Sequence, residues 1–292
     1  MKQALIKLHM AILLAGFTGV LGRLITLNEG LLVWYRLGIT ILAMLLLSLF
    51  RHNLPKVGQK EMGRLAAVGF LIALHWLCFY GSIKSSNVSI ALVCFSSSSF
   101  FSAVTEPLLY RKRADITEVL LSLVGIGGIY IILHFDRRFT SGILLGLAAA
   151  FLSALFTILN KKLTETHSPA TLTFYELGAG FLFLSLLMPF YLHAFPSSRL
   201  LPTAKDWMYL LILSLACTIW AFELSLSAMK KVSSFTTNLS YNLEPVYGIL
   251  LAFLIFKENK SFNNQFYIGV LLIFLSVILQ SRRMIRLHKA EG

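Results

Sequence analysis

The chain has 292 residues, of which 57% are hydrophobic and 13% are charged, and its formal net charge is +13. So apolar a composition excludes a soluble globular domain and indicates a polytopic membrane protein. The positive charge does not indicate nucleic-acid binding, because the basic residues cluster in short loops between apolar segments, which is the pattern that sets membrane orientation.

Ten apolar segments follow one another along the chain, each near the roughly 20 residues that a membrane-spanning helix needs. The links between them are short and carry charges and helix breakers, as at Asn28-Glu29-Gly30. We therefore predict an all-α membrane protein with ten transmembrane helices. The segments are about 5–23, 30–50, 63–83, 88–110, 115–134, 141–160, 169–192, 206–228, 232–256 and 264–281.

The distribution of basic residues predicts the orientation in the membrane. With ten crossings, 17 of the 26 Lys and Arg residues fall on the side that holds both termini, and 8 fall on the other side. Since cytoplasmic loops are enriched in Lys and Arg, both termini should be cytoplasmic, in a plasma (inner) membrane.

The chain also repeats itself. A shift of 140 positions places residues 32–50 on residues 172–190 with eight identities, and a shift of 144 places Trp76 on Trp220. Because five helices per half is an odd number, the second half should enter the membrane in the opposite sense. Inverted repeats place a transport site at their interface near the midplane. The predicted parts are a first repeat at 1–138, an inverted second repeat at 139–284 and a basic cytoplasmic tail at 285–292.

The segment 232–256 carries a carboxylate beside a proline, at Glu244-Pro245. Pro245 predicts a kink or hinge. A buried acid at the bilayer centre costs about 2.5–3.5 kcal/mol on the insertion scale and usually faces a cavity or a partner. A broken, polar helix at the midplane is typical of a transporter site. The alternative is a proline kink healed by neighbouring side chains, with Glu244 in a structural hydrogen bond. Further candidate binding residues in this segment are Asn238, Tyr241 and Asn242.

Three short motifs accompany the doubled five-helix plan: Ser-Ile-Lys-Ser-Ser-Asn-Val-Ser at 82–89, Glu-Pro-Leu-Leu at 106–109, and Leu-Glu-Pro-Val at 243–246 followed by Lys257-Glu258. With them the chain resembles the drug/metabolite transporter superfamily, specifically its EamA-type members. The first half departs from the pattern, since Arg-Lys-Arg-Ala at 111–114 stands where the second half has the Lys-Glu that is typical of the family.

The resemblance implies a single-chain secondary transporter, commonly an exporter of amino acids or other small metabolites. It also implies a central cavity lined by the first, third, fourth, sixth, eighth and ninth helices, with the fifth and tenth at the periphery. The implied partners are a small-molecule substrate and the lipid bilayer. A monomer is sufficient for such a function, and the sequence leaves the oligomeric state, the coupling ion and export versus import open.

Arg36 lies inside the second segment and is permanently charged. Its planar guanidinium suits a carboxylate or phosphate, so it could attract an anionic substrate group or pair with a gating carboxylate. Alternatively, it snorkels toward the outer headgroups beside Trp34 and Tyr35. The repeat places Glu176 at the position equivalent to Arg36, but at a different depth, which argues against a direct pair.

Glu176, Glu223 and Glu244 are candidates for proton coupling. If Glu176 and Glu223 lie close together, one could bind and release a proton as the cavity changes access. The alternative is that Glu176 and Glu223 form ordinary ion pairs at the cytoplasmic edge. The lysines available for such pairs are Lys161, Lys162, Lys230 and Lys231.

The run Ser96-Ser97-Ser98-Ser99 is unusual in a spanning segment. In the repeat it falls opposite the polar residues around Tyr241, so the two patches could form a polar cavity wall. Serine hydroxyls can also bond to carbonyls of the preceding turn, and four adjacent residues cannot all face one way. We expect one or two of these serines to line the site, with Ser97 and Ser98 as the candidates.

Aromatic and histidine side chains complete the candidate wall. Trp76, Tyr80 and Trp220 could contact an apolar or cationic ligand, or simply pack. His75 titrates near neutral pH, but a lone histidine beside a tryptophan is more often a hydrogen-bonded packing residue.

No motif in the sequence indicates catalysis, a metal or a cofactor. The three cysteines have unrelated spacings within apolar segments, and there is no C-x-x-C, Walker loop or G-x-S-x-G. We therefore expect no enzyme, no catalytic residue, no bound metal and no cofactor. The alternatives are an intramembrane enzyme that pairs a serine with His75, and a structural or receptor protein with a passive polar core.

Overall fold

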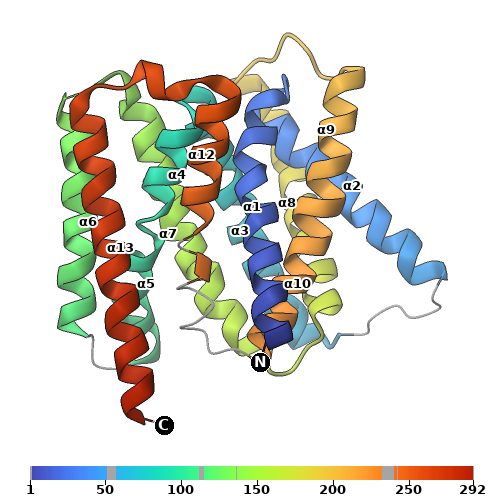
Figure 1. The fold of residues 1–292 in the computed structure, drawn as a ribbon. Helices are drawn as coiled ribbons and strands as arrows, with labels where there is room; N and C mark the ends of the chain where they lie inside the picture. Colours follow the sequence, from blue (N-terminus) through green and yellow to red (C-terminus); the bar gives the residue numbers. More distant parts are fainter. Residues whose placement is uncertain are drawn as a thin grey trace.

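The computed structural model describes residues 2–50, 57–111, 115–135, 137–231, 240–241 and 243–291, and every regular element in these ranges is a helix. The predicted all-α class is therefore confirmed (Figure 1). The elements are α1 (Lys2–Leu24), α2 (Glu29–Phe50), α3 (Gln59–Ser85), α4 (Val88–Phe95), α5 (Ser98–Tyr110), α6 (Ile116–Phe135), η1 (Arg137–Phe139), α7 (Thr140–Leu163), α8 (Pro169–Ala194), α9 (Ala204–Ser214), η2 (Leu215–Trp220), α10 (Ala221–Met229), α12 (Glu244–Phe256), η3 (Glu258–Ser261) and α13 (Asn264–Glu291).

Seven stretches of these helices are long and apolar enough to cross a membrane, and three further apolar helices of the described chain are shorter. The chain is therefore a multi-pass membrane protein. The three shorter helices are Val119–Ile132, Glu244–Phe256 and Asn264–Ser276.

At two polar places a described helix breaks or begins. The segment at 88–110 divides into α4 and α5 at Ser96 and Ser97, which form a turn. α12 begins at Glu244, so Pro245 lies in the first turn of this helix. Proline fits this place because the first backbone N–H groups of a helix have no partner within it. The predicted site residues Asn238 and Asn242 lie outside the described residues.

A third irregularity is η2, a π-helical turn between α9 and α10. The hydroxyl of Thr218 donates a 2.8 Å hydrogen bond to the carbonyl of Leu213, five residues earlier. π-turns inside α-helices often occur at functional sites, because they redirect side chains locally.

Both termini lie at the same face of the bundle, at the bottom of Figure 1, and we call this the terminal face. The loops at the other end, including that between α12 and α13, form the opposite face. α6 and α13 pack on each other at one edge of the molecule.

The remaining helices include two groups that surround the centre. In the first helix group, α1 packs on η2, α10 and α12; in the second helix group, α7 packs on α3, α4 and α5. The two groups meet where α4 packs on α12 and where α1 packs on α3 and α4. α8 crosses α3 at close range, because a side-chain carbon added at Gly69 would overlap the carbonyl of Glu176. Small residues allow such close approach between membrane helices.

Candidate functional site

A cavity of about 180 Å³ lies between the two helix groups. Its described lining comes from α1, α2, α3, the end of α4, the α4–α5 turn, α5, α7, η2, α10, Tyr241 and the beginning of α12. These are the helices that the resemblance implies, with α2 added through a single residue, Arg36. Within the described lining, α6 and α13 contribute nothing, in keeping with their place at the edge.

Arg36 is the cation of this cavity lining, and it is held firmly. Its side chain is only 2% exposed. Nε donates to the hydroxyl of Thr218 at 2.8 Å, and Nη1 donates to the hydroxyl of Tyr80 at 2.7 Å. The guanidinium carbon lies 3.6 Å from the centre of the Trp76 ring, which adds a cation–π attraction. Arg36 therefore does not snorkel to the headgroups.

The π-turn explains how this arrangement is built. Thr218 in η2 presents its hydroxyl to Nε of Arg36 while it donates to the chain behind it. Ser214, one turn earlier, donates to the backbone carbonyl of Arg36 at 3.1 Å. α2 and the α9–η2 segment are thus joined by hydrogen bonds at the depth of the cavity, and the guanidinium is pre-oriented before any ligand arrives.

Glu244 lines the same cavity from the first turn of α12 and is 6% exposed. Within the described part of the chain its carboxyl group forms no hydrogen bond or ion pair, so the alternative of a structural hydrogen bond has no partner there. Tyr241, close to it in sequence, donates to Ser225 of α10 at 2.9 Å, and both residues line the cavity. A fixed cation and a carboxyl group therefore face one enclosed space.

The serine turn supplies a polar wall. Ser96, Ser98 and Ser99 line the cavity, together with Ser102. Ser97 does not line the cavity; its hydroxyl points back along its own turn and donates to the carbonyl of Cys94 at 2.6 Å. Ser98 has no hydrogen-bond partner in the described part of the chain, which leaves its hydroxyl available to a ligand.

His75 and Trp76 line the cavity, whereas Tyr80 and Trp220 do not. Nδ1 of His75 donates to the carbonyl of Ala149 at 2.8 Å, so in the neutral ring Nε2 is an acceptor. Tyr80 is fully buried behind Arg36 and acts on the cavity through that residue. Trp220 is 57% exposed and lies away from the cavity.

Glu176 sits behind the cavity wall with no exposed surface. One of its oxygens, Oε2, accepts a 3.0 Å hydrogen bond from Asn160, which lines the cavity, while Oε1 is buried without a partner in the described chain. Lys161, one of the lysines considered for it, pairs instead with Glu106 at 3.5 Å. Glu223 is half-buried on α10 and does not line the cavity.

Several polar lining residues were not predicted. Three of them, Ser153, Thr157 and Asn160, recur at helical spacing on α7. This one-sided pattern in an apolar helix indicates a polar face and could have been used to predict these residues. Thr18 stands alone in an apolar run and gave none. The role of Thr218 depends on a π-turn, which no sequence pattern marks.

Comparisons with known proteins give a consistent picture. The model of the EamA-like transporter family matches residues 3–134 and 140–282. The chain is 24% identical to the uncharacterized transporter YetK of Bacillus subtilis over 94% of this chain and 87% of that protein. It is also 24% identical to an uncharacterized transporter of Archaeoglobus fulgidus, over 75% of each chain.

A solved crystal structure has the same fold. The superposition covers 97% of this chain and 99% of the other, with a TM-score of 0.64 and 17% sequence identity. At this identity the likeness concerns the fold alone.

Proposed function

Because the chain belongs to the EamA-like transporter family, we propose that it is a secondary active transporter that exports small organic metabolites, such as amino acids, without converting them chemically. The observation that carries the proposal is the buried cavity between two helix groups, with Arg36 and Glu244 in one lining. Placing charged groups inside a membrane protein is costly, and such groups typically mark a substrate or ion path.

We propose ten membrane crossings in two inverted repeats, 1–138 and 139–284, with 285–292 as a cytoplasmic tail. The seven long and three shorter apolar helices support this number, as do termini on one face. Helix packing supports the symmetry. α2 packs on its proposed equivalent α8, α4 on α12 and α6 on α13, while α1 packs on α10 as α7 packs on α3. A two-fold relation between the halves would produce these pairs.

The orientation proposed for the chain puts the terminal face in the cytoplasm and the protein in the plasma (inner) membrane. The excess of Lys and Arg on the loops of that face supports this orientation. One chain encloses the cavity, so a monomer is sufficient for the function.

Alternating access would follow from movement of the first helix group against the second. Each group combines helices of both sequence halves: α1 with α10 and α12 in one, and α3, α4 and α5 with α7 in the other. The moving bodies would therefore be these groups, and the cavity between them would open to one face at a time.

Roles within the cavity follow from the chemistry of its lining. Arg36 would bind an anionic group of the substrate, since its guanidinium is pre-oriented and permanently charged. Ser98, Tyr241 and Nε2 of His75 would offer hydrogen bonds, and Trp76 an aromatic wall. Glu244 would bind a cationic group or a proton in exchange for substrate. Glu176 would be a second protonation site, reached through Asn160, and Glu223 a third candidate nearer the terminal face.

The first test is to find the solute. Metabolite profiles of cells with and without the protein would be compared, and each solute that accumulates without it would be tested for binding to the purified chain. We expect at least one solute to bind to the wild type and to lose affinity in Arg36→Gln. Chemical conversion of that solute by the purified protein would instead favour an enzyme, and no difference in profile or binding would contradict the proposal.

A further inference from the structure

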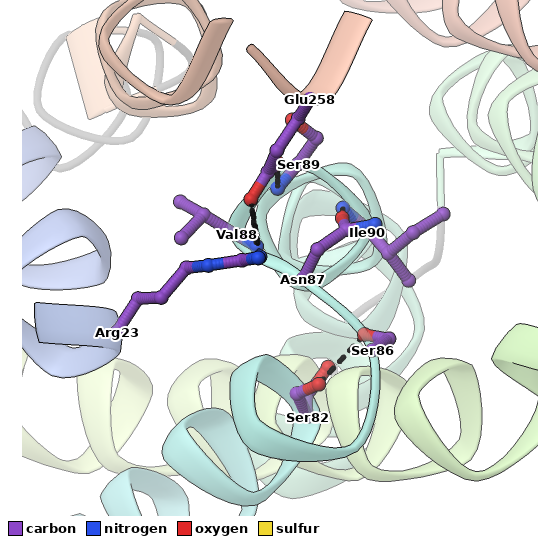
Figure 2. Close-up of polar contacts among 8 residues, drawn as sticks. All are labelled: Arg23, Ser82, Ser86, Asn87, Val88, Ser89, Ile90 and Glu258. Atoms are coloured by element: carbon purple, nitrogen blue, oxygen red, sulfur yellow. Dashed lines mark hydrogen bonds and ion pairs between the residues drawn. The ribbon is translucent and has the colours of Figure 1, made fainter. Parts of the chain in front are cut away.

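Glu258, just beyond α12, is a buried carboxylate outside the cavity. It is 3% exposed and accepts four hydrogen bonds. Figure 2 shows the residues that surround it. Oε1 accepts from Nη1 of Arg23 at 2.7 Å and from the backbone N–H of Val88 at 3.1 Å. Oε2 accepts from the backbone N–H and the hydroxyl of Ser89, at 2.9 and 2.6 Å. A carboxylate is stabilised at this place because unpaired N–H groups and positive partial charge gather at the first turn of a helix.

This network joins the two helix groups. Glu258 follows α12 and Arg23 lies in the last turn of α1, so both belong to the first group. Val88 and Ser89 begin α4 of the second group. The contact therefore crosses the boundary along which the groups would separate.

The turn between α3 and α4, which precedes the groups that bond to Glu258, is itself held by hydrogen bonds. The hydroxyl of Ser86 donates to the carbonyl of Ser82, and the hydroxyl of Ser82 donates to the carbonyl of Gly142 on α7, both at 2.6 Å. Asn87 caps α4 by accepting from the N–H of Ile90 at 2.9 Å. A pull on the first turn of α4 is thus transmitted to α3 and α7.

Beneath the network, α1 and α12 lie directly against α4. A side-chain carbon added at Gly19 would lie 3.0 Å from Val88, and one added at Gly248 would overlap Leu92. Toward the opposite face the described cavity lining ends at Thr18 on α1 and at Phe79 on α3, whereas on α7 it reaches Asn160 in the last turn at the terminal face. This conformation is therefore sealed on the side of the opposite face.

We propose that Glu258, together with Arg23 and the first turn of α4, is the latch of the gate at the opposite face. The latch holds the two helix groups together above the cavity, and it must separate before the cavity opens to that side. This inference rests on the proposed alternating access. In the first half of the sequence, Lys112 follows Arg111 where Glu258 follows Lys257, so the repeat provides no second carboxylate at the equivalent place.

The test measures access without needing a substrate. A reporter cysteine replaces Ser98 in a chain whose cysteines at 78, 94 and 217 are changed to Ala. A membrane-impermeant maleimide is applied from each face separately. Glu258→Gln should raise the labelling rate from the opposite face about tenfold, as expected when a buried, hydrogen-bonded charge is removed. Glu61→Gln, which breaks an exposed ion pair with Arg64, is the matched control and should leave the rate unchanged.

A second variant, Arg23→Gln, tests the same contact in case Glu258→Gln does not fold. The side chain of Arg23 is 38% exposed, and in Arg23→Gln the carboxylate of Glu258 loses its counter-charge but keeps the three hydrogen bonds from Val88 and Ser89; this variant should raise labelling in the same direction by a smaller factor. The double variant should not exceed Glu258→Gln, because both changes open one contact. Unchanged labelling in the folded single variants would overturn the latch. If these variants open the cavity while the wild type moves no solute, the latch stands and the transport function fails.

Discussion

Nη1 of Arg36 donates a 2.7 Å hydrogen bond to the hydroxyl of Tyr80, a residue that is fully buried and does not itself line the cavity. The hydroxyl of Thr218 accepts a hydrogen bond from Nε of the same guanidinium, and the guanidinium stacks on the ring of Trp76. Three residues on two other segments therefore orient one cation within the cavity. Because each of these residues holds the guanidinium in a different way, their substitutions should have different effects.

Arg36→Lys should reduce transport by about tenfold or more, although the charge remains. A lysine ammonium cannot reproduce the planar fork that bonds to Thr218 and Tyr80 and stacks on Trp76. The efflux rate and the affinity of the purified protein for its solute measure the change. Arg64→Lys on the exposed part of α3 is the control, and wild-type kinetics in Arg36→Lys would remove the guanidinium from the site.

Tyr80→Phe should destabilise the protein by about 1–3 kcal/mol, because it leaves a buried donor of Arg36 without its acceptor. We expect a lower unfolding midpoint in detergent and a weakened solute affinity. Tyr35→Phe removes a 3.2 Å hydrogen bond to Leu200 at an exposed position, and it should change the midpoint little. Equal effects of the two substitutions would contradict the assigned role of Tyr80.

Glu244→Gln should impair transport more than folding. The substitution preserves shape, and the carboxyl group has no hydrogen-bond partner to lose in the described chain, so the yield and the unfolding midpoint should remain close to wild type. The transport rate should fall because the group that exchanges a proton or a cation is gone. Glu165→Gln, in the exposed turn after α7, serves as control, and unchanged export in Glu244→Gln would exclude Glu244 from the mechanism.

Glu176→Gln should separate exchange from coupling. If Glu176 carries a proton, the variant should still exchange labelled for unlabelled solute across a vesicle membrane, but an imposed pH gradient should no longer drive net accumulation. Loss of both activities together, with the fold intact, would instead assign Glu176 to packing behind Asn160.

Trp76 and Trp220 occupy equivalent positions in the proposed repeats but should differ in effect. Trp76→Leu removes the ring that lies 3.6 Å from the Arg36 guanidinium. The guanidinium then loses a desolvated cation–π contact of roughly 2 kcal/mol, and solute affinity should fall by about tenfold. Trp220→Leu changes a side chain that is 57% exposed and should leave affinity unchanged. A larger loss in Trp220→Leu would show that the cavity has been assigned to the wrong side of that helix.

The helices were predictable from the sequence because membrane spans leave a strong signal in composition and length. The apolar segments, the polar break at Ser96–Ser99 and the importance of Arg36 and Glu244 all follow from the cost of polar groups in lipid. The sequence left open whether Arg36 is buried or reaches the headgroups, and the structure places it with Glu244 in the lining of one cavity.

Which side chains of each helix face the cavity could not be predicted. This depends on the rotation of the helix about its axis, which an apolar sequence specifies weakly. Ser97 and Ser98 are neighbours, yet one is bonded to its own turn and the other lines the cavity. Trp220 matched Trp76 by position, but η2 alters the helical phase just where Trp220 stands. The network of Glu258 joins residues about 170 positions apart, and no local pattern reveals such a contact.

Solute counterflow in liposomes tests the central claim most directly. Vesicles containing the purified protein are loaded with an unlabelled solute that the profile comparison has identified, and labelled solute is added outside. We predict a transient accumulation of label that disappears in Arg36→Gln and in liposomes without protein. Uptake in the wild type that does not exceed that of empty liposomes, for every solute that binds, would contradict a transport function for this cavity.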